Sequence, residues 1–423
     1  MKKIKGLRWW IIGLIALATV INYIDRSTLA LMWPSISKDL GMNKNDYAFI
    51  LNVFMIAYAV GQLVSGKLFD KVGTRLGYVI AIGIWGISSF MHSFARGILS
   101  FSFFRATLGL GEAGNWPGAV KSNAEWFPIK ERAVAQGIFN AGASIGSVIA
   151  PPLIATLWVI FGWQITFMIV GSFGIIWLIP WLVINKKIPA EHPWLTEEER
   201  EYILSGQSEQ DRKNVKGKCL STKQILSYKE SWAVLVARFF LEPIWWLFVG
   251  WMPIYLAEVY GFNVKEIGFF AWVPYVGAAL GSIYGGYYAG KLMSKGTNLN
   301  KARKTAIVIG GIIMFLGLIA TILIADTALK FVLIVAFVLF GFQFSIGNIQ
   351  TIPSDLFSGK SVGTLAGFGG SVGVFSVIVM NFLVPVISKF SYIPIFMMIA
   401  VFVPLGVFAV FYFAKNIGPV ENN

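Results

Sequence analysis

Stretches of about 20 apolar residues recur along the whole chain, and each is long enough to cross the roughly 30 Å of hydrocarbon in a lipid bilayer. Hydrophobic residues make up 56% of the 423 positions and charged residues only 13%, with a mean hydropathy of +0.69, which is far more apolar than a soluble domain. The pattern predicts an all-α membrane protein with twelve transmembrane helices. The expected spans are 9–35, 46–68, 76–95, 98–122, 132–160, 164–185, 231–256, 266–290, 305–325, 329–352, 362–387 and 392–414.

Residues 186–229 are the one long polar interruption, and they divide the twelve segments six and six. We therefore predict a six-helix bundle at 1–185, a linker at 186–229 and a second six-helix bundle at 230–423. The halves repeat weakly, since Pro34 near the end of the first segment matches Pro253 near the end of the seventh. In the linker, Thr196 precedes Glu199 by three residues, a capping-box spacing that predicts the start of a short surface helix.

The net charge of +14 could suggest a nucleic-acid partner, but the positions of the basic residues argue against one. Most of the 35 Lys and Arg residues fall in segments expected on one side of the membrane, so the positive-inside rule places both termini in the cytoplasm. The first apolar segment is too long for a signal peptide and is expected to remain as a helix. The single cysteine, Cys219, lies in the linker, so no intramolecular disulfide can form.

Four charged residues stand inside the apolar segments. Asp25 and Arg26 lie in the first, while Arg105 and Glu112 lie in the fourth, two helical turns apart and so on one face. A charge at bilayer depth costs at least ~2.5 kcal/mol on insertion scales, so such residues usually serve a function. Two acids and two bases in the membrane indicate a protonatable site that attracts an anion. The alternative is that they form fixed ion pairs that brace the helices.

A second motif, Gly66 to Arg75, lies in the short loop after the second segment. Its glycines permit a tight turn, and Asp70 with the basic residues can form a charge network that holds one conformation and releases it in another. We predict a conformational latch formed by Gly66, Asp70, Gly73 and Arg75. Only this half should carry the full latch, because Gly290 stands where the acid would be in the second half.

The latch motif resembles the signature of the major facilitator superfamily. A closer resemblance covers almost the whole chain and points to its anion:cation symporter family, most similar to bacterial hexuronate transporters. The residues that carry it are 22–26, 111–118, 124–128, 131–133, 137–142 and 238–246. The resemblance implies a secondary transporter in which an arginine of the first helix holds the carboxylate of the substrate, while the adjacent aspartate and a glutamate of the fourth helix are proton sites.

Those positions are Arg26, Asp25 and Glu112 here. The chemistry of the side chains agrees, because a guanidinium offers a planar fork of donors that matches a carboxylate and stays charged at any cellular pH. Movement of Arg26 or Arg105 relative to the buried acids could switch their affinity for protons. The sequence does not show which arginine pairs with which acid.

We expect polar and aromatic residues of the apolar segments to contact the uncharged part of a sugar acid. The alternative for each of these residues is a role in helix packing or in hydrogen bonding between helices. The candidates for substrate binding beside Arg26 and Arg105 are Tyr23, Tyr58, Asn115, Trp116, Asn140, Asn348 and Ser371. Arg238 and Glu242, four residues apart, can satisfy each other on one helix face, and a structural pair is at least as plausible as a functional one. His92 is expected to be a packed residue rather than a proton relay.

The sequence thus predicts a proton-coupled symporter, acting as a monomer in the bacterial inner membrane, that imports hexuronates such as glucuronate and galacturonate. With two histidines, one cysteine and no phosphate-binding loop, it offers neither a metal site nor ATP-driven transport, and we expect no cofactor and no enzymatic activity. The alternatives are a symporter of an aldonate or aldarate, such as galactonate or glucarate, or of another organic anion. A membrane sensor that does not transport is a remote alternative.

Overall fold

The structure, a computed structural model, describes residues 3–127, 129–204, 222–356 and 360–418. Within helices it also leaves out the side chains at positions 63, 66, 67, 70, 120, 124, 129–134, 136, 222, 354 and 360–364. Cys219 and the middle of the linker therefore lie outside the described residues.

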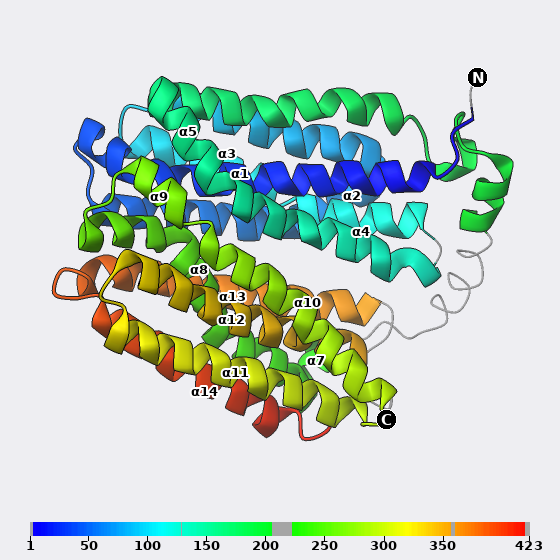
Figure 1. Cartoon of the computed structure of the whole chain (residues 1–423). Coiled ribbons are helices and arrows are strands. Elements are labelled where there is room, and N and C mark those ends of the chain that lie inside the picture. The colour runs from blue at the N-terminus through cyan, green and yellow to red at the C-terminus, as the bar shows by residue number, and fades with distance from the viewer. Residues whose placement is uncertain (1–2, 128, 205–221, 357–359, 419–423) are drawn as a thin grey trace. The chain divides into compact units, whose positions relative to one another are not determined.

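Long helices make up nearly all of the described chain, as Figure 1 shows, and the expected all-α fold is confirmed. In chain order they are α1 (Leu7–Leu40), α2 (Lys44–Met91), η1 (His92–Phe94), α3 (Ile98–Glu112), α4 (Asn115–Trp126), α5 (Ile129–Ile184), η2 (Pro189–Glu191), α7 (Thr222–Ser227), α8 (Lys229–Tyr260), α9 (Val264–Phe270), α10 (Val273–Ser294), α11 (Leu299–Ile324), α12 (Ala328–Leu356), α13 (Lys360–Ile387) and α14 (Ile393–Phe413).

Two of these helices contain a sharp break at a glycine. Gly73 in α2 has φ 78°, and Gly162 in α5 has φ 74°, a left-handed backbone conformation that suits glycine because it has no Cβ. Each break separates two of the predicted spans. The predicted span 98–122 is instead made of α3 and α4, which meet at residues 113–114.

In the described part of the chain, nine stretches are long and apolar enough to cross a membrane. One of them, Gly137–Ile184, contains two predicted spans because it continues through the break at Gly162. The arrangement as a whole is consistent with twelve membrane-crossing segments.

The helices group into two compact units. The first comprises Met1–Lys213 and Asn263–Phe269, and the second comprises Asn214–Phe262 and Phe270–Asn423. In the first unit α1 packs mainly on α5, and α2 packs on α3. In the second, α12 packs on α10 and α11, while α8 packs on α13 and α14.

Small residues set the distances between helices in the first unit. A Cβ added at Gly142 would lie 2.5 Å from the backbone oxygen of Ala16, and one added at Gly146 would lie 2.6 Å from that of Val20. Both clashes involve the backbone of α1, so α5 can approach this closely only with glycine at these positions. Gly142 and Gly146 therefore serve the close packing of α5 on α1.

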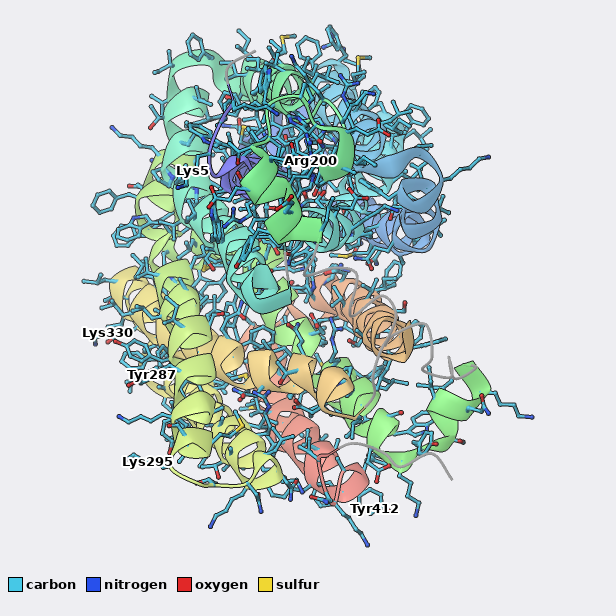
Figure 2. The ribbon with its side chains drawn as sticks, turned by 90° about the vertical axis from the view of Figure 1, so that its right-hand side faces the viewer. Lys5, Arg200, Tyr287, Lys295, Lys330 and Tyr412 are labelled. Atoms are coloured by element: carbon cyan, nitrogen blue, oxygen red, sulfur yellow. The ribbon has the colours of Figure 1, made fainter. Side chains whose placement is uncertain are left out.

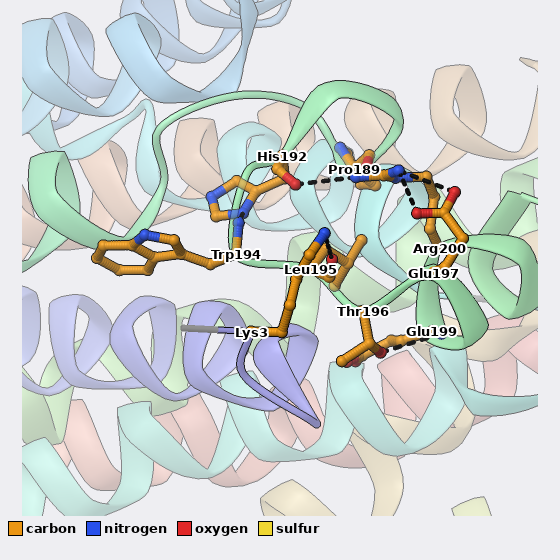
Figure 3. A network of polar contacts seen from close by, with 9 residues as sticks. All are labelled: Lys3, Pro189, His192, Trp194, Leu195, Thr196, Glu197, Glu199 and Arg200. Carbon is orange, nitrogen blue, oxygen red and sulfur yellow. Dashed lines mark hydrogen bonds and ion pairs between the residues drawn. The ribbon is translucent and has the colours of Figure 1, made fainter. Parts of the chain in front are cut away.

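The start of α1 is held by the first part of the linker, and we call residues 3–8 together with 184–200 the N-terminal clamp. Ile4 donates its backbone N–H to the oxygen of Trp194 at 2.8 Å, and Lys3 Nζ donates to the oxygen of Leu195 at 2.9 Å. Lys5 and Arg200 are labelled at this end of the first unit in Figure 2, and Figure 3 shows the clamp from close by.

Glu199 has a role in the clamp that its spacing did not predict. Its backbone N–H bonds to Thr196 Oγ1 at 3.3 Å, and residues 197–204 are helical, as the capping-box pattern predicted. Its carboxylate, however, accepts the backbone N–H of Gly6 at 2.8 Å and pairs with Arg8 at 2.6 Å. The carboxylate therefore caps the N-terminus of α1, where the helix dipole favours a negative charge.

His192 lies buried in the clamp as a neutral imidazole. Its Nε2 faces the carbonyl of Ile184 at 2.9 Å and therefore donates, while its Nδ1 accepts the N–H of Trp194 at 3.3 Å. Burial lowers the pKa of His192, and the cations of Lys186 and Arg200 lower it further, against a raising effect of the Ile184 hydrogen bond.

We expect the clamp to loosen in mild acid. The pKa of His192 is lower in the folded state than its ordinary value of about 6.5. Between the folded-state pKa and about 6.5 the unfolded state binds more protons than the folded state, so the free energy of unfolding rises with pH in this window. The stabilisation is therefore complete above about pH 6.5 and is lost as the pH falls toward the folded-state pKa. Limited proteolysis of residues 184–204 should accelerate below that pH in the wild type but not in His192→Asn. A wild-type rate that does not change with pH would contradict this.

Candidate functional site

Arg26 lies at the centre of the buried polar residues of the first unit. It stands in the middle of α1, with its side chain 6% exposed. Its Nε and Nη2 donate to the same oxygen, Oε2 of Glu112, at 3.1 and 2.9 Å. Glu112 closes α3 and is fully buried, and its other oxygen, Oε1, has no hydrogen-bond partner in the described part of the chain.

Three aromatic rings surround the Arg26 guanidinium. Its Cζ lies 4.9 Å from the ring centroid of Tyr58, 5.3 Å from that of Tyr23 and 5.5 Å from that of Phe54. Phe54 and Tyr58 are one helical turn apart on α2 and stack on each other. They reach Arg26 because α2 and α3 touch at Gly109, where an added Cβ would lie 2.7 Å from the backbone oxygen of Phe54. Cation–π attraction and the ion pair with Glu112 thus stabilise the buried positive charge of Arg26.

Asp25 points to a different helix from its neighbour Arg26. Its Oδ1 accepts a hydrogen bond from Ser89 Oγ of α2 at 2.5 Å, and Asp25 is only 1% exposed. The structure therefore assigns the pairing that the sequence left open, because Arg26 pairs with Glu112 and Asp25 takes a neutral partner.

Arg105 completes the set of four charges. It is 2% exposed, and its Cζ lies 5.8 Å from the centroid of Phe54, so Arg26 and Arg105 share this ring. Neither its Nε nor its Nη2 has a hydrogen-bond partner among the described residues. These donors can receive an anion that enters beside Phe54.

The remaining candidates of the first unit are Asn115, Trp116 and Asn140, and their contacts or exposure differ from those of the four charged residues. Asn115 is buried and donates its amide to Thr19 Oγ1 at 3.0 Å, which joins α4 to α1. Trp116 is half-buried and packs edge-on against Phe139 with ring centroids 4.7 Å apart. Asn140 is exposed on α5.

The two candidates of the second unit make local contacts. Asn348 is buried in α12, where its amide donates to backbone oxygens of Gly285 and Phe344 and its Oδ1 accepts from Arg303 at 3.2 Å. Ser371 is exposed on α13 and donates to the oxygen of Gly367. The contacts of Asn348 correspond to the alternative that the sequence left open, hydrogen bonding between helices.

Arg238 and Glu242 do satisfy each other on α8, at 2.6 and 2.8 Å. They fit against a glycine-rich face of α13, where a Cβ added at Gly373 would lie 2.6 Å from Glu242 Cγ. His92 is packed, as expected, with its ring stacked on Phe167 at 5.0 Å.

The described part of the predicted latch is a turn with polar contacts. Gly73 makes the turn, and Arg75 is exposed and donates to the backbone oxygen of Leu182 at 3.3 Å. Next to them Thr74 donates to Glu125 at 2.8 Å. Gly66 and Asp70 lie within α2, but the side chain of Asp70 lies outside the described part of the chain, so the latch stays a prediction.

Sequence reasoning missed Phe54 and Ser89, although each had a signal. Phe54 lies four residues before Tyr58 and therefore on the same helix face. Ser89 is a polar residue in an apolar segment, of the kind that often serves as a partner to a buried charge.

Comparison with known proteins agrees with this architecture. The model of the Major Facilitator Superfamily matches residues 15–380. The hexuronate transporter of Escherichia coli K12 is 35% identical over 428 residues, which covers 100% of this chain and 97% of the relative. The galacturonate transporter of Dickeya chrysanthemi is 38% identical over 316 residues, covering 74% of this chain and 91% of the relative.

Among solved structures, a D-xylose–proton symporter gives a TM-score of 0.73 at 15% identity and covers 97% of both chains. A bacterial homologue of the human lysosomal transporter Spinster, in an inward-facing and occupied conformation, gives the same TM-score at 16% identity. These two likenesses concern the fold alone. By the family match and the full-length relative, the chain belongs to the Major Facilitator Superfamily and is a multi-pass membrane transporter.

Proposed function

We propose that the protein imports hexuronates, such as glucuronate and galacturonate, together with protons. The observation that carries the proposal is the buried Arg26, which lies against the rings of Tyr23, Phe54 and Tyr58 and is paired with Glu112. The named activities of the E. coli and Dickeya relatives support the substrate class.

The arrangement suggests how a proton and a carboxylate are coupled. The Nε and Nη2 donors of Arg26 both bond to Glu112, so a carboxylate of the substrate competes with Glu112 for the same guanidinium. When Glu112 takes up a proton it loses its negative charge, its hold on Arg26 weakens, and the substrate can replace it. Substrate binding in turn favours the protonated form of Glu112, because the coupling between two bound species is reciprocal.

In the cycle we propose, the site opens to the outside with Asp25 and Glu112 protonated, and the carboxylate of the sugar acid docks on Arg26. The two halves then rock, and loss of the protons inside lets Glu112 recover Arg26 and release the substrate. The unpaired donors of Arg105 and the Tyr58 ring complete the anion site. The proton gradient supplies the energy, so no cofactor takes part. We place the protein in the bacterial inner membrane as a monomer, with both termini in the cytoplasm.

Uptake of radiolabelled sugar acids tests the proposal. We expect cells that express the protein to accumulate glucuronate and galacturonate, and an uncoupler to abolish the accumulation. Galactonate, with one carboxylate, and glucarate, with two, serve as competitors, and preference for either would favour the alternative of an aldonate or aldarate symporter. Accumulation that persists with the uncoupler would refute proton coupling, and absence of uptake of all four would refute the substrate class.

A further inference from the structure

A pocket opens between the start of α11 and the end of α14 in the second unit. Its volume is about 520 Å³, which is within the usual range of ligand-binding pockets. Deeper along the two helices the gap closes, because a Cβ added at Gly311 would lie 2.7 Å from Val407 Cγ2. Both helices are long and apolar enough to cross a membrane, so the pocket, near Tyr412 in Figure 2, lies at a membrane surface.

The polar lining of the pocket consists of cations and hydrogen-bond donors. Asn298, Lys301 and Lys304 follow one another at intervals of three residues, so they share the face of α11 that lines the pocket. Asn298 Oδ1 accepts the backbone N–H of Lys301 at 2.8 Å, and Asn300 Oδ1 accepts that of Ile417 at 3.1 Å. Because both amide oxygens are engaged, the NH₂ groups of the two asparagines remain available to donate to a ligand.

The positive charges of the two lysines are not neutralised by a carboxylate among the described residues. Lys304 Nζ donates to the backbone oxygen of Lys415 at 2.8 Å, which leaves two of its three N–H groups for a ligand. Lys301 is exposed at the rim. The carboxylate of Asp355 on the neighbouring α12 is held by Arg303 at 2.9 Å and forms no pair with either lysine. The pocket therefore favours an anion.

The deeper wall of the pocket is apolar. It is formed by Val308, Ile309 and the exposed ring of Phe411. From Val308 an apolar row continues along α11 through Ile312 and Leu316, at intervals of four residues, and these two side chains are exposed. A soluble anion gains nothing from such a surface, whereas the acyl chains of a lipid bury it.

We propose that this pocket binds an anionic phospholipid, with its phosphate on Lys301 and Lys304 and its acyl chains against Val308 and Phe411. Basic pockets between transmembrane helices bind the headgroups of anionic lipids in this way. A pocket of similar volume at the end of α1, about 540 Å³, is lined by the carboxylate of Asp39 and by no lysine, so the basic lining is particular to this site. The inference is independent of the proposed function, because it concerns a separate site and its test needs no transport.

Lipid binding to the full-length protein in detergent tests the proposal. Native mass spectrometry gives dissociation constants for phosphatidylglycerol, for phosphatidylcholine and for soluble glycerol 3-phosphate. The test variants are Lys301→Gln alone, which leaves the contacts of Lys304 in place, and Lys301→Gln combined with Lys304→Gln. The matched control combines Lys291→Gln with Lys295→Gln, which removes the same charge from two exposed residues at the end of α10, outside the pocket.

We expect the wild type to bind phosphatidylglycerol at least about tenfold more tightly than phosphatidylcholine, which has no net charge. The double test variant should lose this preference and Lys301→Gln should lose part of it, while the control should keep it. An equal loss in the control would show a general attraction to surface charge and overturn the inference, as would a wild type without the preference. Glycerol 3-phosphate that binds as tightly as phosphatidylglycerol would show a site for a soluble phosphate and overturn the assignment to a lipid.

Discussion

Arg26→Ala is expected to abolish uptake of hexuronates, and Arg26→Lys to lower it by about ten- to a hundredfold. Lysine keeps the positive charge but loses the planar fork, and one charge-assisted hydrogen bond is worth about 1.5–3 kcal/mol, with ~1.4 kcal/mol for each factor of ten. Initial rates of radiolabelled glucuronate uptake in liposomes measure the effect directly.

Arg8→Lys is the matched control for Arg26, since it makes the same change on the same helix. Arg8 pairs with Glu199 at the start of α1, away from the aromatic rings around Arg26. We expect near wild-type uptake from it, which would show that α1 tolerates an arginine-to-lysine change. Wild-type uptake by Arg26→Ala would remove Arg26 from the substrate site.

Glu112→Gln is expected to uncouple transport. Glutamine has nearly the shape of a protonated glutamate and can still accept a hydrogen bond from Arg26, but it cannot bind or release a proton. Counterflow exchange of glucuronate should therefore continue, while accumulation against a gradient should fall to the level of the wild type with an uncoupler. Both are measured in the same liposomes, with an imposed pH gradient for the second.

Glu242→Gln provides a control with the same chemistry in the second unit. Glu242 is also a carboxylate paired with an arginine on a membrane-spanning helix, with side-chain exposures of 10% for the acid and 16% for Arg238. We expect it to keep proton-driven accumulation. If Glu112→Gln accumulated substrate with ordinary pH dependence, Glu112 would have no part in coupling.

The sequence predicts which residues are important more readily than it predicts their partners. Asp25, Arg26, Arg105 and Glu112 stand out because a charge in the membrane costs at least ~2.5 kcal/mol. The choice of Ser89 for Asp25 and of Glu112 for Arg26 depends on how α1 is rotated against α2 and α3. That rotation follows from close contacts at glycines such as Gly109 and Gly146, which act over distances in sequence that no local pattern reveals.

Helix boundaries, too, were predicted from the sequence only in part. The turn at Gly73 was predicted because glycine before basic residues after an apolar segment indicates a tight loop. The break between α3 and α4 was not predicted, since the apolar pattern continues through it. In the second unit, Asn348 was a candidate because it is polar at depth, but its bonds to Arg303 and to two backbone oxygens need the packed helices to be seen.

The N-terminal clamp has a practical consequence for the choice of affinity tags and fluorescent fusions. The backbone of Ile4 is paired with Trp194, and the N–H groups that begin α1 are capped by Glu199. A fusion partner joined at the N-terminus without a spacer would disturb these contacts at the start of α1, the helix that carries Asp25 and Arg26. Purification and imaging of the active protein are therefore better served by a fusion at the C-terminus, which leaves the start of α1 in its native contacts.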